Sequence, residues 1–82
     1  MITRKPKAGE WVLRVEPEQI VAETEKAYGL DLLGNGRGLF WVPKSVIVAR
    51  ALPLSHTRSG GFIVKDWFGR KYARTAGPFY RA

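Results

Sequence analysis

The amino-acid sequence predicts a mainly β, α+β fold: a small SH3-like or OB-like barrel or half-barrel of four or five short strands with one short C-terminal helix. Three observations predict this fold class. Short runs rich in β-branched and aromatic residues recur along the chain, turn and proline signals separate these runs, and apolar residues at helical spacing follow near the C-terminus. The sequence alone does not choose between the SH3-like and the OB-like arrangement.

The 82 residues suit one domain, because this length is near the lower end of what a single hydrophobic core supports. An apolar content of 45% argues against disorder throughout the chain. We expect residues 1–9, which are basic and lead into no apolar signal segment, to form a flexible tail, and residues 10–82 to form the β-rich domain. The absence of Cys excludes disulfides and favours a reducing, cytoplasmic location.

The first half of the chain contains two expected strands. Trp11–Glu16 is a β-prone run that Pro17 ends. The segment from Ile20 to Glu25 is ambiguous, whereas Thr24–Leu32 alternates well enough for a strand. One face of that strand would carry Thr24, Lys26, Tyr28, Leu30 and Leu32.

A hairpin is expected next. Gly34–Gly38 contains an Asn-Gly pair, which supplies the positive φ values of a tight hairpin turn. Leu39–Val42 would return as the paired strand. Pro43 cannot donate a ladder hydrogen bond, so it marks a strand end, a bulge or an edge strand.

The second half adds two strands and the helix. Ser45–Leu52 is a β-rich stretch, Pro53–Gly61 is an expected exposed loop, and Phe62–Val64 is the last expected strand. Asp66 is the expected N-cap of the helix, and Gly77-Pro78 closes it. In that helix Phe68 and Tyr72 are one turn apart and would meet on the same face.

Positive charge is concentrated in the second half. Residues 37–82 carry nine Lys and Arg and one acid, which gives +9 − 1 = +8, whereas residues 1–36 give +5 − 6 = −1. Most of the aromatic residues also lie in the basic half. Cations neutralise phosphates and aromatic rings stack on bases, so this mixture favours a nucleic-acid partner.

Nine residues are candidates for that contact: Arg37, Trp41, Lys44, Arg58, Lys65, Trp67, Arg70, Lys71 and Arg74. Each has a structural alternative. Because Phe40 and Trp41 alternate, one of them should lie inside, and we expect Trp41 in the core; Trp67 is also expected to anchor its helix in the core. Lys44 is expected to be solvated. If Phe68 packs on the sheet, then Arg70, Lys71 and Arg74 project outward.

Catalysis is not expected. One His (His56, expected in solvent), no Cys and scattered carboxylates do not make a usual metal site. No Ser-His-Asp arrangement or paired-carboxylate spacing stands out. We therefore expect no enzyme, no metal and no cofactor. The acidic stretch Glu16–Glu25 is expected to be a solvated edge that discourages aggregation.

Three segments carry a resemblance: Thr24–Ala27 (TEKA), Phe40–Ile47 (FWVPKSVI) and Ile63–Phe68 (IVKDWF). Together they resemble a family of small, mostly uncharacterised proteins of phages, prophages and bacteria, with the W-x-P-K-S element as the most specific part. The resemblance implies a compact β-rich domain, often from mobile-element genomes, and no catalytic assignment. The Gly-rich hairpin and the basic segment Arg70–Arg74 depart from the pattern.

Two main hypotheses follow. The first is a non-specific nucleic-acid-binding protein that prefers single strands, encoded by a phage or other mobile element and acting in the bacterial cytoplasm. The second is a protein-binding inhibitor or adaptor that acts on a host nuclease, polymerase or CRISPR effector. A third is a virion or assembly component that uses Ile63–Phe68 as its interface. No membrane partner is expected, because no apolar run approaches about 20 residues.

Overall fold

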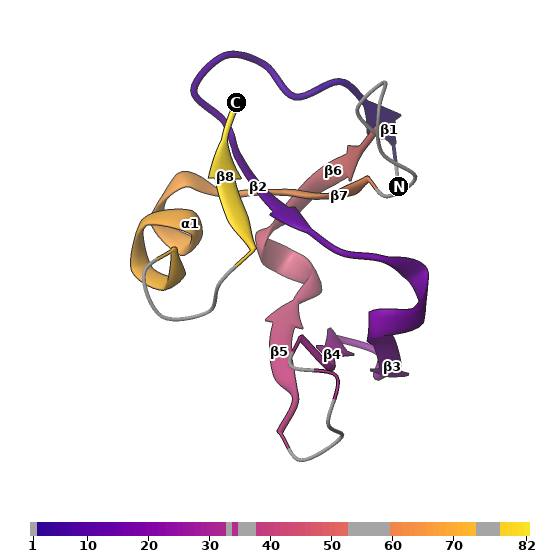
Figure 1. Cartoon of the computed structure of the whole chain (residues 1–82). Coiled ribbons are helices and arrows are strands. Elements are labelled where there is room, and N and C mark those ends of the chain that lie inside the picture. Colours follow the sequence, from indigo (N-terminus) through magenta and orange to yellow (C-terminus); the bar gives the residue numbers. More distant parts are fainter. Residues whose placement is uncertain (1, 33, 35–37, 53–59, 74–77) are drawn as a thin grey trace.

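Two β-sheets and one short helix make up the described part of the chain in the computed structural model, residues 2–32, 34, 38–52, 60–73 and 78–82 (Figure 1). Sheet A has five strands in the order β1 (Thr3–Arg4), β6 (Ile47–Ala51), β7 (Gly61–Val64), β2 (Trp11–Arg14) and β8 (Phe79–Arg81). Sheet B has three strands in the order β3 (Ile20–Glu23), β4 (Ala27–Leu30) and β5 (Phe40–Pro43). Helix α1 spans Asp66–Tyr72, and 3-10 turns lie at Pro17–Gln19 and Lys44–Val46.

The expected fold class is confirmed at this level, a mainly β chain with one short helix. The closed barrel is not found. Within the described residues no ladder joins sheet A to sheet B, and the eight strands exceed the expected four or five. The count was low because β1 and β8 have only two and three residues, too few for a visible alternating pattern.

The main core lies between the two sheets. Leu13 and Phe62 of sheet A pack with Leu30 and Val42 of sheet B in one apolar cluster. The ring of Tyr28 stacks on that of Phe62 with centroids 5.3 Å apart. Removal of these side chains from water is the main favourable term that holds the sheets together.

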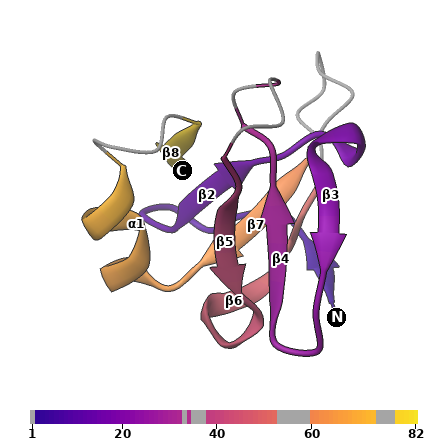
Figure 2. The same ribbon diagram turned by 90° about the horizontal axis from the view of Figure 1, so that it is seen from below.

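Helix α1 is attached to the same core beside β5, as Figure 2 shows. The Phe68 ring lies 6.1 Å from that of Phe40 in β5 and 4.8 Å from that of Tyr72. The predicted meeting of Phe68 and Tyr72 on one helix face is confirmed. As an interface the segment Ile63–Phe68 would have to be exposed, and half of it is not, because Ile63, Val64 and Phe68 are buried.

The sequence placed the strands of sheet B only in part. The ambiguous segment is β3, an edge strand, and the predicted pairing of the hairpin strands is confirmed, with Leu30 opposite Phe40. The strand predicted from Thr24 begins only at Ala27. Thr24 makes a tight turn, because its Oγ1 accepts a hydrogen bond of 3.0 Å from the backbone N–H of Ala27. Residues 35–37 of the expected Asn-Gly turn lie outside the described residues.

The N-terminal segment belongs to the sheet and is not a flexible tail. Thr3 and Arg4 pair in parallel with Arg50 and Ala51 of β6. Residues 5–10 then cross from β1 to β2, past the two strands between them, along the top of Figure 1. The crossing ends beside β8, where the N–H of Gly9 donates to the carbonyl oxygen of Ala82 at 2.7 Å. A strand of two residues is too short for its sequence to predict this pairing.

An ion pair spans this crossing. Arg4 donates two hydrogen bonds of 2.8 Å, one to each carboxylate oxygen of Glu10. The backbone N–H of Lys7 donates to the same carboxylate at 2.6 Å. These bonds, that of Arg4 above all, lower the pKa of Glu10 to about 2 and raise the pKa of Arg4 above its ordinary value.

Two capping and boundary predictions have different outcomes. Pro43 is the last residue of β5, and β5 is an edge strand, as expected. The predicted N-cap is wrong: Lys65 occupies that position, and Asp66 is the first helical residue. Most of the loop 53–61, including His56, and Gly77 lie outside the described residues.

Candidate nucleic-acid interface

Helix α1 presents an aromatic and cationic surface. Phe68 and Gly69 are buried against the core, whereas Lys65, Trp67, Arg70 and Lys71 are exposed. The separation follows from the 3.6-residue period, which turns residues 68 and 72 inward together and leaves 67, 70 and 71 toward solvent. The sequence prediction that Arg70 and Lys71 project outward is therefore confirmed.

Close backbone contact holds α1 on sheet A. A Cβ atom on Gly69 would lie 2.5 Å from Cβ and 2.7 Å from Cδ2 of Trp11, so only glycine fits at this crossing. Trp11 is half-buried, and its Nε1 has no hydrogen-bond partner among the described residues. The Trp11 side chain thus packs directly against the backbone of α1 at Gly69.

Arg81 lies beside the same tryptophan. Trp11 pairs with Val64 on one side and with Arg81 on the other, which brings the C-terminal strand to the end of sheet A where α1 begins. The Arg81 guanidinium carbon is 5.8 Å from the Trp11 ring centroid. Its Nε donates to the carbonyl oxygen of Gly9 at 3.2 Å. Arg81 therefore adds a positive charge next to the helix.

The charges of this surface are only partly neutralised. Arg70 pairs with Asp66 one turn earlier, with Nε 2.7 Å from Oδ2, and both side chains are more than half exposed. The Lys71 Nζ lies 5.3 Å from the ring centroid of Tyr72. Neither Lys65 nor Arg81 forms an ion pair within the described part of the chain. We call Lys65, Trp67, Arg70, Lys71 and Arg81 the helix surface.

Trp67 is on the surface, and the prediction that it anchors the helix in the core is wrong. Its side chain is 55% exposed, and its ring meets that of Phe68 edge-on at 5.6 Å. Phe68 fills the anchoring position instead, because it faces Phe40 and Phe79 inside. The indole of Trp67 is available to a flat partner.

Trp41 is also exposed, which corrects the prediction that it lies in the core. Of the alternating pair, Phe40 faces inward and meets Tyr72 at 5.4 Å, while Trp41 lies on the outer face of sheet B with 46% exposure. Its ring covers Gly29, where a Cβ would lie 3.1 Å from Cη2 of Trp41. The prediction that one of the two lies inside is confirmed.

Lys44 is neither free for a phosphate nor simply solvated. Its Nζ is 2.6 Å from Oε2 of Glu23 and 4.8 Å from the ring centroid of Tyr28. The hydrogen bond to Glu23, with its charge, raises the pKa of Lys44 above its ordinary value. The predicted solvated acidic edge is found in this region, since Glu23 lies on the edge strand β3.

The structure gathers four of the nine candidate residues and separates two. Lys65, Trp67, Arg70 and Lys71 share the helix surface, whereas Trp41 lies on β5 of sheet B and Lys44 begins the 3-10 turn that follows β5. Arg37, Arg58 and Arg74 lie outside the described residues. Arg81 was missed, because nothing in the sequence predicts the short strand β8 that brings it there.

Among the described residues, no group of three or more His, Cys, Asp and Glu side chains could hold a metal ion. No helix of the described residues has the length and apolarity to cross a membrane.

Comparisons with protein-family models, curated proteins and solved structures find no match to this chain. The resemblance to small phage and bacterial proteins stays a prediction.

Proposed function

We propose that this chain is a small nucleic-acid-binding protein that prefers single strands and acts without base-sequence specificity. The observation that carries the proposal is the helix surface, where Trp67 is exposed on the same short helix as the exposed Arg70 and Lys71, next to the exposed Lys65, with Asp66 as the one carboxylate of this helix. The chain has a net charge of +7, which favours approach to a polyanion at long range.

Each component of the helix surface has a distinct part in this proposal. Lys65, Lys71 and Arg81 contact phosphates and release condensed counterions, and Arg70 does so when it leaves Asp66. Trp67 stacks on a base, which requires an unpaired base and so favours single strands over duplex. Nothing in this arrangement reads base edges, so sequence specificity is not part of the proposal.

The finer expectations from the sequence are carried as part of the same proposal. An SH3-like or OB-like half-barrel suits single-strand binding, since such folds often bind strands across an exposed sheet face. The proposed origin is a phage or other mobile element, and the proposed location is the interior of a bacterial cell. Arg37, Arg58 and Arg74 stay predicted phosphate contacts.

The test is fluorescence anisotropy of a labelled single strand of about 30 nucleotides and of its duplex, titrated with protein over a range of salt concentrations. The four phosphate contacts of the helix surface, taken alone, predict a slope of about −3 in log K against log salt for the single strand, and any contact by Arg37, Arg58 or Arg74 makes it steeper. Lys65→Glu/Lys71→Glu should reduce the slope to about −1.5, because two contacts are lost.

The matched control is Arg14→Glu/Lys26→Glu, which changes the net charge equally at exposed residues away from α1. It should bind more tightly than the helix variant and keep the steeper slope. Equal loss in both variants would reduce the proposal to general electrostatic attraction. No binding of the unaltered protein at low salt would reject it.

A protein-binding inhibitor or adaptor of a host nucleic-acid enzyme is the second candidate, and the outer face of sheet B favours it. Trp41 is exposed there over Gly29 and Ala22, none of these three carries a charge, and Val21 at the bulge of β3 is 53% exposed. Exposed apolar and aromatic side chains on one sheet face suit a protein surface better than a phosphate backbone. The test is capture of a stoichiometric protein from bacterial extract, and recovery of none would contradict this candidate.

A further inference from the structure

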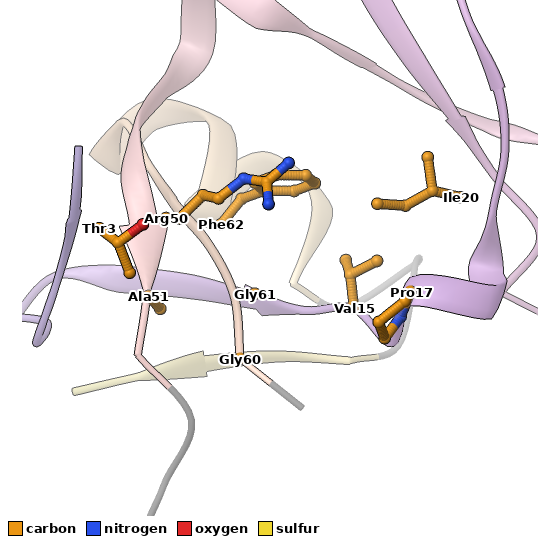
Figure 3. Close-up of a pocket in the computed structure, with 9 residues that line it drawn as sticks. All are labelled: Thr3, Val15, Pro17, Ile20, Arg50, Ala51, Gly60, Gly61 and Phe62. Carbon is orange, nitrogen blue, oxygen red and sulfur yellow. The ribbon is translucent and has the colours of Figure 1, made fainter. Parts of the chain in front are cut away.

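A pocket of about 400 Å³ lies between strands of sheet A and the segment that leads into β3 of sheet B, and none of its lining residues belongs to the helix surface. Its lining comes from β1, β6, β7 and the segment that leads from β2 to β3: Thr3, Val15, Pro17, Ile20, Arg50, Ala51, Gly60, Gly61 and Phe62. Figure 3 shows Thr3 and Arg50 on one side and Val15, Pro17 and Ile20 on the other. The volume is within the range of about 300–1,000 Å³ that is usual for small-molecule sites.

Residues with little or no side chain line one part of this pocket. Gly61 cannot carry a side chain, because a Cβ there would clash with the carbonyl oxygen of Leu13 in the neighbouring strand. Gly60 and Ala51, also in the lining, contribute little or no side-chain volume. No rotamer change of these three residues could therefore fill the pocket.

The walls are apolar, and one charged side chain enters. Val15 and Phe62 are buried core residues, and Ile20 packs against the same core. Arg50 extends from β6 toward the middle of the pocket (Figure 3). Thr3, its partner across the β1–β6 ladder, supplies a hydroxyl group on the same side.

Arg50 differs from three other cations of the molecule. Arg4, Lys44 and Arg70 each pair with a carboxylate at 2.6–2.8 Å. Arg50 forms no ion pair with any described residue, and its side chain stays exposed at the pocket. A guanidinium presents paired N–H donors in a fixed plane, the geometry that a carboxylate accepts.

We propose that this pocket binds a small organic monocarboxylate. Its apolar body packs on Val15, Ile20 and Phe62, and its carboxylate accepts hydrogen bonds from the Arg50 guanidinium and the Thr3 hydroxyl. Arg50 is the one cation among the described residues that line the pocket. A single cation matches one negative charge, whereas a phosphate dianion would call for further donors. The site shares no residue with the helix surface, so it stands whether or not nucleic acid binds there.

The experiment is a titration of the full chain with hexanoate. NMR monitors the backbone amide shifts of Thr3, Ile20 and Phe62 and the shift of the side-chain Nε–H of Arg50. Hexan-1-ol and hexylamine, of equal chain length, replace the carboxylate by a neutral and a positive group. The proposal expects shifts at these residues with hexanoate and at least tenfold weaker binding of both analogues, because a charge-assisted hydrogen bond is lost.

Variants test the assigned donors. Arg50→Gln should weaken hexanoate binding by about tenfold or more, and Arg50→Lys by less, since the charge remains without the paired donors. Thr3→Val should weaken it a few-fold. The control Arg14→Gln removes an exposed arginine that does not line the pocket and should leave the affinity unchanged. Because Arg50 is exposed, its replacement leaves the fold intact, which the amide spectrum checks.

Three results would overturn the proposal: no shifts at the pocket residues, equal affinity for hexanoate and hexan-1-ol, or equal loss in Arg50→Gln and Arg14→Gln. N-acetyl-leucine carries the same chemistry as a peptide C-terminus. Tighter binding of N-acetyl-leucine than of hexanoate would support the site with a chain end as its source, and the reverse order would support it with a free acid.

Discussion

The two exposed tryptophans of this molecule lie on surfaces of opposite character. Trp67 projects from α1 among Lys65, Arg70 and Lys71, whereas Trp41 lies flat over Gly29 on the outer face of sheet B. The nearest candidate cation of sheet B, Lys44, is bound to Glu23. Two residues of the same type are thus equally available for stacking, but only one has cations free to meet phosphates.

Under the proposed function, exposure of an aromatic ring is not by itself enough for a nucleic-acid site. The decisive feature is whether neighbouring cations already have carboxylate partners. Two of the three strands of sheet B, β3 and β4, lie in the acidic half of the chain, and Glu23 of β3 pairs with Lys44. Helix α1 has one acid, Asp66, for two cations, Arg70 and Lys71, and Lys65 precedes it.

The largest expected effect is a difference in the stability lost on substitution in α1 and in sheet B. Each of these regions has a glycine that packs against a tryptophan, Gly69 against Trp11 and Gly29 against Trp41. Gly69→Ala should destabilise the fold by about 2–3 kcal/mol, because the new Cβ overlaps a half-buried indole and displaces α1. Gly29→Ala should cost about 1 kcal/mol or less, since the exposed Trp41 ring can move by a few tenths of an ångström.

Urea unfolding of both variants measures this difference. Gly38→Ala is the control, because a Cβ there meets nothing within 4 Å and should change the stability by less than about 0.5 kcal/mol. Similar losses for Gly69→Ala and Gly38→Ala would mean that α1 is not held by contact with Trp11.

A smaller effect separates the two tryptophans by ligand. Trp67→Ala should weaken single-strand binding by about 1–3 kcal/mol through loss of base stacking, with little change in the salt slope. Trp41→Ala should leave this binding almost unchanged and should abolish capture of any protein partner. The measurement is the same anisotropy titration, and a larger loss from Trp41→Ala would move the nucleic-acid site to sheet B.

The smallest expected effect compares the ion pairs of the two sheets. The pKa of Glu10 is about 2 in the folded protein and 4.5 when unperturbed, so its pairing stabilises the fold above pH 4.5 and the benefit is lost as the pH falls toward 2. After screening by solvent the loss should be about 1 kcal/mol. Glu10→Gln should flatten the stability profile over this range.

Glu23→Gln is the matched change in sheet B. Its carboxylate is 55% exposed against 24% for Glu10, so its replacement should lower the stability at neutral pH less than Glu10→Gln does. Thermal unfolding at pH 7 compares the two variants, and unfolding between pH 2 and pH 6 measures the profile of Glu10. A larger effect from Glu23→Gln would contradict the assignment of the stronger pair to Arg4 and Glu10.

The sequence by itself determined the local features of this protein. Runs of β-branched and aromatic residues located β2, β7 and the pairing of β4 with β5, and the spacing of Phe68 and Tyr72 located the buried face of α1. The distribution of charge along the chain singled out Lys65, Arg70 and Lys71 as candidate contacts, and helical spacing predicted that Arg70 and Lys71 project outward. These features are readable because backbone periodicity and side-chain polarity act within a few residues.

Only the tertiary structure decided which aromatic rings are buried and which cations are neutralised. Phe40 took the inward position that Trp41 was expected to fill, and Trp67 is exposed although it was expected in the core, because the space between the sheets is set by partners distant in sequence. The ladder of β8 with β2 places Arg81 beside Trp11. Lys44 forms an ion pair with Glu23 of β3. Contacts between residues 21 to 70 positions apart leave no local pattern, so the three-dimensional packing alone determines them.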